Sequence, residues 1–441
     1  IMQSITWNRY PGKVYPINPR EKEIMGLPVY PSVEAVPGNV DVAFIALAAA
    51  AVPGVLRECR RKGVKFAVVH SSGFGELNEA GKKLEQEMTG IARDGGPRVI
   101  GANSMGVYSP RSSLNTVITY EAVQHEPGGV AFIGQSGWAT ENYVRLGLEQ
   151  GLRFSKVVSI GNQCDLTIED FFPYFASDSE TRMVTGYLED VKRPGEFLQV
   201  ARKLSAKKPV ILWKASRTPA GMRVAASHTG SMATDQAVFE AALKKTGVIM
   251  ATNMKELVDI AAGFTCPFLP GGDRVGLVVN SGGVGTASAD AIEAAGLKLD
   301  LLPEQAQREI YDYLKGLTPL IPSVVNPVDV GWLPQWRDVV PYVTCLDIML
   351  RHVDMGMIMS FTPLDGEVLS KLKDLRDKHK KPVFIIPGHP TTEKKAIDLF
   401  SADGVPTYVY PEDAVKAMAA LWRYARWRND TSPDTVSKSR G

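Results

Sequence analysis

Val130–Gly137 reads VAFIGQSG and Val275–Gly282 reads VGLVVNSG, so two distant stretches share one pattern. Each is an apolar run followed by a polar residue, a serine and a glycine, which is typical of a buried strand that turns into a helix. The second stretch follows the first by 145 residues, and the same offset relates Gly151-Leu152 to Gly296-Leu297, which open the next apolar run. We therefore predict two copies of one α/β unit, with chance likeness between strand–turn–helix units as the alternative.

The same alternation of apolar runs and amphipathic stretches continues on both sides of this pair. It predicts mainly parallel sheets that are covered by helices on both faces. The glycine- and proline-rich segments near Pro127 and at Phe268–Asp273 divide the chain into predicted domains 1–127, 128–270 and 271–430, followed by a flexible tail, 431–441. The predicted strands are Lys13–Asn18, Val40–Leu47, Phe66–Ser72, Arg98–Asn103, Val130–Ile133, Lys156–Ile160, Arg182–Leu188, Pro209–Lys214, Val275–Val279, Leu297–Leu301, Met355–Phe361, Pro382–Ile386 and Pro406–Tyr410.

Composition excludes several classes of protein. The 441 residues include 50 Lys+Arg against 48 Asp+Glu, so the net charge of +2 argues against a nucleic-acid partner. The longest apolar run, Val42–Val52, is too short to span a bilayer, and no membrane partner is expected. Four scattered cysteines favour neither a disulfide framework nor a zinc site, which fits the cytoplasm, and no metal site is predicted. The first residues, IMQSITWNRY, look like the end of a helix, so we expect that further residues precede Ile1.

Two turns are candidate phosphate sites. At Gln135-Ser136-Gly137 and at Asn280–Gly283, backbone N–H groups at the start of a helix would face outward, and the small residues let a phosphate approach. A merely tight turn explains each of them equally well. The chain contains neither the glycine-lysine loop that cradles nucleotide phosphates nor the glycine fingerprint of dinucleotide-binding proteins, so direct binding of ATP or NAD has no support from these motifs.

The segment Lys214–Asp235 (KASRTPAGMRVAASHTGSMATD) is unusually long for an α/β loop, and such loops are commonly functional. It carries His228 between small residues, where a neutral imidazole could act as a nucleophile towards a phosphoryl group. Glu189 follows an apolar run, at the strand edge where α/β proteins build their sites, and could orient that histidine. A surface histidine and a strand-end carboxylate are the alternatives. We interpret the remaining histidines as structural or surface residues: His70, His125, His352, His379 and His389.

The sequence of this loop and of several other motifs resembles that of a known enzyme family. The loop SRTPAGMRVAASHTGS is similar to the phosphohistidine loop of the nucleoside-diphosphate-forming acyl-CoA synthetases, a group that includes ADP-forming acetate–CoA ligase and is related to the succinyl-CoA synthetase alpha subunit. The resemblance extends over nearly the whole chain, because several motifs follow the family's order. They are KVYPINP, GLPVYPSV, SSGFGE and VIGANSMG, then GQSG, SIGNQCD and YLED, and finally VVNSGGVG and NPVD.

The resemblance implies a fold, a reaction and roles for individual residues. The fold would be a CoA-binding Rossmann-like domain followed by two flavodoxin-like, succinyl-CoA synthetase-like domains. The enzyme would be an acid–thiol ligase that phosphorylates an acid, displaces the phosphate with CoA and passes the phosphoryl group through His228 to or from ADP, with Glu189 orienting the imidazole. Phosphate would be bound by Ser136, Gly137, Gly161 and Asn162. CoA would be bound by Asn18, Pro19, Ala48, Ser71, Ser72, Gly73 and Asn103.

The chain also departs from the family's pattern. The strand and glycine turn that hold the CoA diphosphate in the family would lie before Ile1, and Trp138 and Glu141 stand where small apolar residues are commoner. Trp138 and Glu141 are therefore predicted to shape an acyl pocket, and the small carboxylic acid need not be acetate.

Nothing in the sequence resembles the ATP-grasp domain that binds ATP, ADP and magnesium in the family. The resemblance therefore implies an alpha subunit in a hetero-oligomer or dimer with an ATP-grasp beta subunit, or the front part of a fused chain. Two other functions stay open: a non-catalytic acyl-CoA-binding regulatory module on the same fold, and a nicotinamide-dependent dehydrogenase. The His228 loop argues against both, since neither needs a phosphorylatable histidine.

Overall fold

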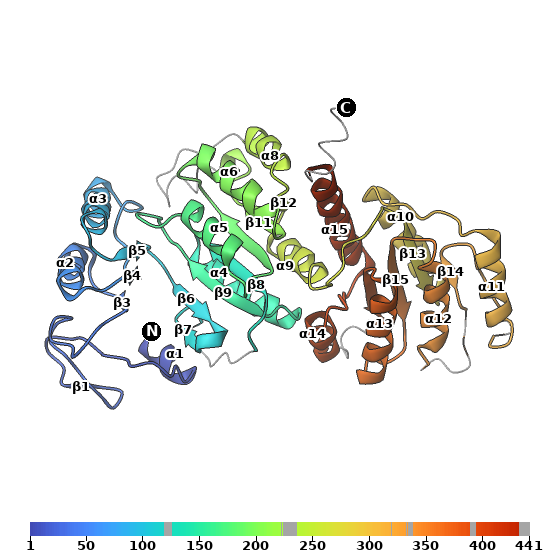
Figure 1. Ribbon diagram of the computed structural model, residues 1–441, viewed down its shortest axis with the longest axis horizontal. Coiled ribbons are helices and arrows are strands. Elements are labelled where there is room, and N and C mark those ends of the chain that lie inside the picture. The colour runs from blue at the N-terminus through green and yellow to red at the C-terminus, as the bar shows by residue number, and fades with distance from the viewer. Residues whose placement is uncertain are drawn as a thin grey trace. The chain divides into compact units, whose positions relative to one another are not determined.

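The computed structural model describes residues 1–118, 126–221, 223, 236–318, 320–331, 333, 338–388 and 394–431. Its residues group into two compact units, each of which contains strands and helices (Figure 1). Unit 1 comprises Ile1–Val144 and Arg153–Met250, and unit 2 comprises Arg145–Leu152 and the chain from Ala251 onward. Among the described residues, no helix combines the length and the apolar character that crossing a membrane requires.

A three-stranded parallel sheet forms the first part of unit 1, as predicted. Its order is β3 (Val42–Ile45), β4 (Phe66–Val69) and β5 (Arg98–Ile100). The helices α2 (Val52–Lys62) and α3 (Glu79–Arg93) connect these strands and pack against each other. The remaining short elements of this part are α1 (Met2–Trp7), β1 (Glu23–Ile24), β2 (Leu27–Pro28) and the 3-10 turn η1 (Ala49–Ala51).

The predicted strand Lys13–Asn18 is wrong, because the structure holds there only a single bridge between Ile17 and Tyr30. Pro11, Pro16 and Pro19 supply the reason. A proline has no backbone N–H, so three prolines in nine residues prevent a continuous ladder of hydrogen bonds.

A seven-stranded sheet forms the rest of unit 1. Its order is β12-β11-β10-β8-β9-β6-β7, and β9, β8, β10 and β11 are paired in parallel. Numbered along the chain, β9-β8-β10-β11-β12 is the order 2-1-3-4-5 of flavodoxin-like proteins. The strands are β8 (Val130–Gly134), β9 (Phe154–Ser159), β10 (Met183–Leu188), β11 (Val210–Lys214) and β12 (Ile249–Ala251). The helices are α4 (Gly137–Glu149), α5 (Ile168–Ser177), α6 (Pro194–Ser205) and α8 (Gln236–Lys244).

Two strands of this sheet were missed by the sequence interpretation, which expected parallel strands up to Pro127. β6 (Gly106–Ser109) pairs antiparallel with β9, and β7 (Leu114–Asn115) pairs antiparallel with β6. The short turn η2 (Pro110–Ser112) reverses the chain between them, and a connection this short can join only antiparallel strands. The hairpin belongs to the sheet that follows it in sequence, not to the sheet of β3, β4 and β5.

Unit 2 repeats the strand order of the preceding sheet. Its strands are β13 (Val275–Val279), β14 (Val328–Asp329), β15 (Met355–Ser360) and β16 (Val383–Pro387), which lie in the order β14-β13-β15-β16 and are all parallel. This matches β9-β8-β10-β11, and the predicted duplication is confirmed at the level of strand order. The helices that follow the first strand also correspond, because α10 (Gly282–Ala294) follows α4 by the predicted offset.

Two predicted strands of unit 2 are reduced to single bridges. Leu297–Leu301 contributes only the pair Arg274–Lys298, and Pro406–Tyr410 only Ile385–Thr407. The helix α9 (Met254–Gly263) packs with α15 (Pro411–Thr431) in unit 2, where the Tyr408 hydroxyl donates to the Asp259 carbonyl at 2.8 Å. The remaining helices are α11 (Glu304–Leu314), α12 (Val340–Met349), α13 (Gly366–His379) and α14 (Lys394–Ala402).

Candidate active site

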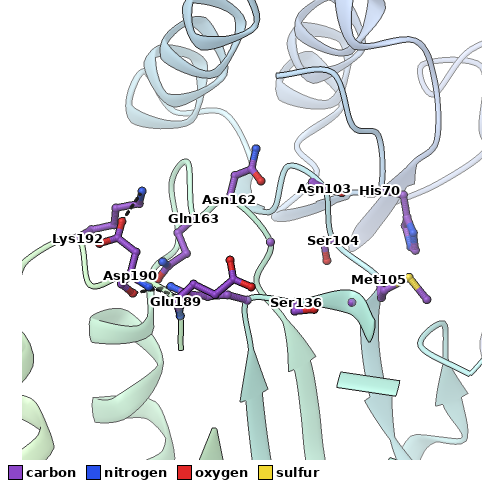
Figure 2. Close-up of a pocket in the computed structure, with 13 residues that line it drawn as sticks. His70, Asn103, Ser104, Met105, Ser136, Asn162, Gln163, Glu189, Asp190 and Lys192 are labelled. Atoms are coloured by element: carbon purple, nitrogen blue, oxygen red, sulfur yellow. Dashed lines mark hydrogen bonds and ion pairs between the residues drawn. The ribbon is translucent and has the colours of Figure 1, made fainter. Parts of the chain in front are cut away.

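A cavity of about 350 Å³ lies in unit 1, at the carboxyl ends of β8 and β10. These two strands are neighbours although β9 lies between them in sequence, so the cavity sits at the switch point where flavodoxin-like sheets bind ligands. Figure 2 shows its polar side chains converging from several loops. The lining residues are His70, Asn103, Ser104, Met105, Gln135, Ser136, Gly137, Gly161, Asn162, Gln163, Glu189, Asp190 and Lys192.

The structure brings six predicted site residues together around this cavity: Asn103, Ser136, Gly137, Gly161, Asn162 and Glu189. The other predicted contacts do not line it. They are Asn18, Pro19, Ala48, Ser71, Ser72, Gly73, Trp138 and Glu141. Trp138 follows the lining residue Gly137 at the start of α4, and its side chain is exposed. His228 lies outside the described residues, so its role stays a prediction.

The side chain of Gln135 connects the turn after β8 to the segment after β10 through hydrogen bonds. Its side-chain oxygen accepts hydrogen bonds from the backbone N–H groups of Glu189 and of Asp190, the latter at 2.9 Å. Its amide nitrogen donates to the Asp190 carbonyl at 2.6 Å. Because Gln135 is buried, these three bonds are shielded from water and hold Glu189 in register with the start of α4.

Glu189 is also held from two other sides. The Tyr187 hydroxyl donates to Glu189 Oε1 at 3.1 Å, and the buried Lys214 Nζ donates to the Glu189 carbonyl at 2.9 Å. Burial lowers the pKa of Lys214, although the carboxylates of Asp190 and Glu189 oppose that shift. Burial and the neighbouring Glu189 both raise the pKa of Tyr187, so its hydroxyl keeps its proton and serves as a donor. The carboxylate is thus oriented before any ligand arrives.

The Tyr187→Phe variant is expected to slow phosphorylation of the chain by about threefold to tenfold, because one hydrogen bond that orients the Glu189 carboxylate is lost. The affinity for CoA should stay unchanged, since Tyr187 is not among the residues that line the cavity. Initial rates of labelling measure the rate of phosphorylation, and calorimetry measures the affinity for CoA. Tyr311→Phe, at an exposed position of unit 2, is the matched control. Equal rates for Tyr187→Phe and wild type would contradict the orienting role.

Gly161 forms a tight turn after β9 against the segment that follows β5. Its backbone has φ +52°, which lies in the left-handed region, and a Cβ atom there would overlap the carbonyl oxygen of Ala102. The same Cβ would stand 2.6 Å from the carbonyl oxygen of Asn103. Only glycine therefore allows the two loops to approach this closely beside the cavity.

We expect Gly161→Ala to lower the free energy of unfolding by about 3 kcal/mol, from the left-handed backbone and the overlap with Ala102 combined. Gly195→Ala is the matched control, because a Cβ at that position of α6 meets no atom within 4 Å and should be neutral or slightly stabilising. Urea unfolding of both variants tests the difference. A Gly161→Ala chain as stable as wild type would mean that the turn relaxes without cost.

The segment Ser71–Gly73 adjoins the cavity through its backbone. Ser71 follows His70 at the carboxyl end of β4, and its carbonyl accepts the N–H of Asn103 at 2.8 Å. Its hydroxyl accepts the N–H of Leu47 at 3.0 Å, so the segment that contains Ala48 lies next to Ser71. Gly73 has φ +98°, and its Cβ position is nearly open, with only Ala49 at 3.6 Å. An extended ligand can therefore lie against this backbone, as the predicted CoA contacts require.

His70 is the clearest residue that the sequence interpretation assigned differently. It was interpreted as structural or surface, yet it lines the cavity and is half-buried. Burial lowers the pKa of His70 to about 4, so the imidazole is neutral near pH 7. Its position directly before Ser71 was the available signal. Among the described residues, no group of three or more His, Cys, Asp or Glu side chains is arranged to hold a metal ion.

The chain is similar to known proteins in its domains and over most of its length. Residues 3–110 match the model of a CoA binding domain, and residues 127–264 match that of a succinyl-CoA ligase-like flavodoxin domain. The alpha subunit of the ADP-forming acetate–CoA ligase II of Pyrococcus furiosus is 37% identical over 426 residues, which cover 94% of this chain and 90% of that protein. The ADP-forming acetate–CoA ligase of Methanocaldococcus jannaschii is 34% identical, and the match covers 94% of this chain but 58% of that longer protein.

A solved structure leads to the same family. The acetyl-coenzyme A synthetase 1 of Ca. Korarchaeum cryptofilum, determined in complex with phosphate and ADP, is 33% identical and matches with a TM-score of 0.85. The match covers 100% of this chain and 93% of that one. The predicted fold class is confirmed: an α/β chain with a CoA-binding domain followed by flavodoxin-like sheets. The chain belongs to the family of ADP-forming acyl-CoA synthetases, in which it corresponds to the alpha subunit.

Proposed function

We propose that this chain is the alpha part of an ADP-forming acyl-CoA synthetase, which converts a small carboxylic acid, CoA and ATP reversibly into acyl-CoA, ADP and phosphate. The observation that carries the proposal is the cavity at the switch point between β8 and β10. There the start of α4 and the carboxylate of Glu189 meet the loops that follow β4, β5 and β9. Family membership supports the reaction class, and the cavity is where we propose that the reaction takes place.

The cavity suits a phosphoryl group more than a bulky apolar ligand. Ser136 and Gly137 open α4, whose first backbone N–H groups lack partners within the helix and attract an anion. Glu189, oriented by Tyr187, would accept the Nδ1–H of a histidine and leave Nε2 free to attack. His228 is the residue that we propose for this role, which a non-catalytic acyl-CoA-binding module would not need.

The residues around the cavity also fit CoA. The backbone of Ser71–Gly73 and the side chain of Asn103 lie at the carboxyl ends of neighbouring parallel strands, next to the proposed phosphoryl site. A thioester end bound there would be close to the start of α4. Asn18, Pro19 and Ala48 would contact more distant parts of CoA, and Trp138 and Glu141 would shape the acyl pocket.

The nucleotide steps require a partner. We propose that ATP, ADP and magnesium bind to an ATP-grasp beta subunit or fused domain. The match with the longer Methanocaldococcus jannaschii ligase covers 58% of that protein, which supports this proposal. We also propose that the reaction takes place in the cytoplasm, since Cys59, Cys164, Cys266 and Cys345 are all free thiols.

The experiment that tests the proposed function is phosphorylation from the acyl-CoA side. The chain is incubated with labelled phosphate and a panel of acyl-CoA thioesters that begins with acetyl-CoA. The expected product is acid-labile, alkali-stable phosphate on a peptide that contains His228. A chain that binds acyl-CoA but takes up no phosphate with any member of the panel would instead support the non-catalytic binding module.

A further inference from the structure

Asn162 has its amide turned away from the cavity in which a phosphate ligand was predicted. The side-chain nitrogen donates to Glu76 Oε2 at 2.6 Å and to Glu85 Oε1 at 2.7 Å. Both hydrogens of the amide are therefore used within the protein. Figure 2 shows this nitrogen pointing away from Ser136 and Glu189. The side chain is thus committed to two carboxylates from another part of the chain.

Glu76 connects Asn162 to the predicted CoA loop. While one oxygen of its carboxylate accepts from Asn162, the other accepts the backbone N–H of Gly73 at 2.6 Å and that of Phe74 at 3.2 Å. Burial opposes ionisation of Glu76, but the hydrogen bonds from Gly73, Asn162 and Phe74 outweigh it and lower the pKa of this carboxyl. Glu76 is therefore a charged acceptor at neutral pH, and bonds to a charged group are stronger than neutral ones.

Hydrogen bonds between backbone groups also connect the same loops. The N–H of Asn162 donates to the Ala102 carbonyl, and the N–H of Cys164 donates to that of Gly101, both at 2.9 Å. The carbonyl of Ser71 accepts from Asn103. The loops that follow β4, β5 and β9 are thus connected to one another by hydrogen bonds. Among these loops, the Asn162–Glu76 pair is a link made by two side chains, which substitution can remove without altering the backbone.

We propose that Asn162 is a positioning residue which, through Glu76, holds the CoA loop Ser71–Gly73 in place relative to the phosphate turn at Gly161. The inference rests on the proposed function, because it assumes that CoA binds at this loop. It assigns to Asn162 a role other than direct contact with phosphate. Its chemical purpose is to keep the thiol end of CoA within reach of the acyl phosphate, since small displacements between reacting groups cost large factors in rate.

The test is the Asn162→Asp variant, which keeps the shape of the side chain but replaces the donor by an acceptor facing two carboxylates. We expect the dissociation constant for CoA, measured by calorimetry on the chain, and the KM for CoA, measured with the beta partner, to rise about tenfold. Phosphorylation of the chain by ATP and the beta partner needs no CoA, so its rate should fall by a clearly smaller factor than the affinity for CoA. Equal losses in both measurements would show general damage to the site and overturn the proposal.

A second substitution reverses the polarity of the link. In Asn162→Asp combined with Glu76→Gln, the new amide of residue 76 can donate to the new carboxylate, while its carbonyl oxygen still accepts from Gly73 and Phe74. Glu85 remains next to the new charge, so we expect a partial recovery of CoA affinity, by about threefold. The absence of any recovery would contradict the link. Glu87→Gln, an exposed position of α3 that pairs with Arg57, is the control and should bind CoA as wild type does.

These measurements separate the inference from the proposed function. A wild-type chain that binds no CoA overturns both. A wild-type chain that binds CoA, together with an Asn162→Asp chain that binds it equally well, overturns the positioning role alone. If thermal unfolding shows that Asn162→Asp does not fold, Asn162→Ser replaces it, because the shorter hydroxyl cannot reach both carboxylates and the same rise in dissociation constant is expected.

Discussion

The His228→Asn variant should accept no phosphoryl group, either from acyl-CoA and phosphate or from ATP and the beta partner. An asparagine amide is not nucleophilic, whereas a neutral imidazole nitrogen attacks an activated phosphoryl group readily. With the carrier removed, the two half-reactions are uncoupled, and overall acyl-CoA synthesis should fall by at least about four orders of magnitude. Binding of CoA should persist, because the predicted CoA contacts lie elsewhere in the chain.

The measurement is acid-labile phosphate per chain, followed by mapping of the labelled peptide. His352→Asn is the matched control, because His352 follows α12 in unit 2 and is assigned no part in the reaction. It should label as wild type does. Undiminished labelling of His228→Asn would remove this histidine from the mechanism and would leave the long loop Lys214–Asp235 without its proposed purpose.

The Glu189→Gln variant should be phosphorylated about a hundredfold more slowly than wild type, which is the second-largest effect that we expect. A neutral amide cannot stabilise the positive charge that develops on the imidazole as it attacks, and it selects the histidine tautomer less strongly. The backbone of residue 189 is held by Gln135 and Lys214 and should not move. The loss is therefore electrostatic and should appear in the rate of phosphorylation, with the affinity for CoA unchanged.

Glu196→Gln provides the control for this substitution, because Glu196 is an exposed residue of α6 that pairs with Arg193 and does not line the cavity. Its labelling rate should equal that of wild type. If Glu189→Gln were also labelled at the wild-type rate, Glu189 would be an ordinary strand-end carboxylate, and the orienting group would have to be sought elsewhere. The smaller effect of Tyr187→Phe should disappear in the Glu189→Gln background, since both act through one carboxylate.

Much of the fold could be predicted from local pattern. Apolar runs of four to six residues marked β8, β10, β13 and β15 because these strands are buried on both faces. The exceptions have a common cause. β6 and β7 are short and half-buried, so their composition carries no continuous apolar signal, and β6 pairs antiparallel with β9, about fifty residues further along the chain.

Some residues of the candidate site could also be predicted from local pattern, and others could not. Ser136, Gly137 and Glu189 could be found because each lies within three residues of the end of a buried strand, and the carboxyl ends of parallel strands meet at one edge. Gln135, Tyr187 and Lys214 could not be assigned their contacts, because a side chain's partner is a matter of three-dimensional approach. For the same reason, the position of His70 directly before Ser71 could not by itself show that this residue lines the cavity.

The sequence by itself determined most of the succession of strands and helices, the duplication and the position of the long loop Lys214–Asp235, because these depend on the periodicity of neighbouring residues and on the order of motifs. Only the tertiary structure decided how the loops meet. Asn162 and Glu76 are 86 residues apart, and their hydrogen bond exists because the ends of β4 and β9 are brought together in unit 1. The residue type limits which hydrogen bonds a side chain can make, but the packing of the sheets determines which of them form.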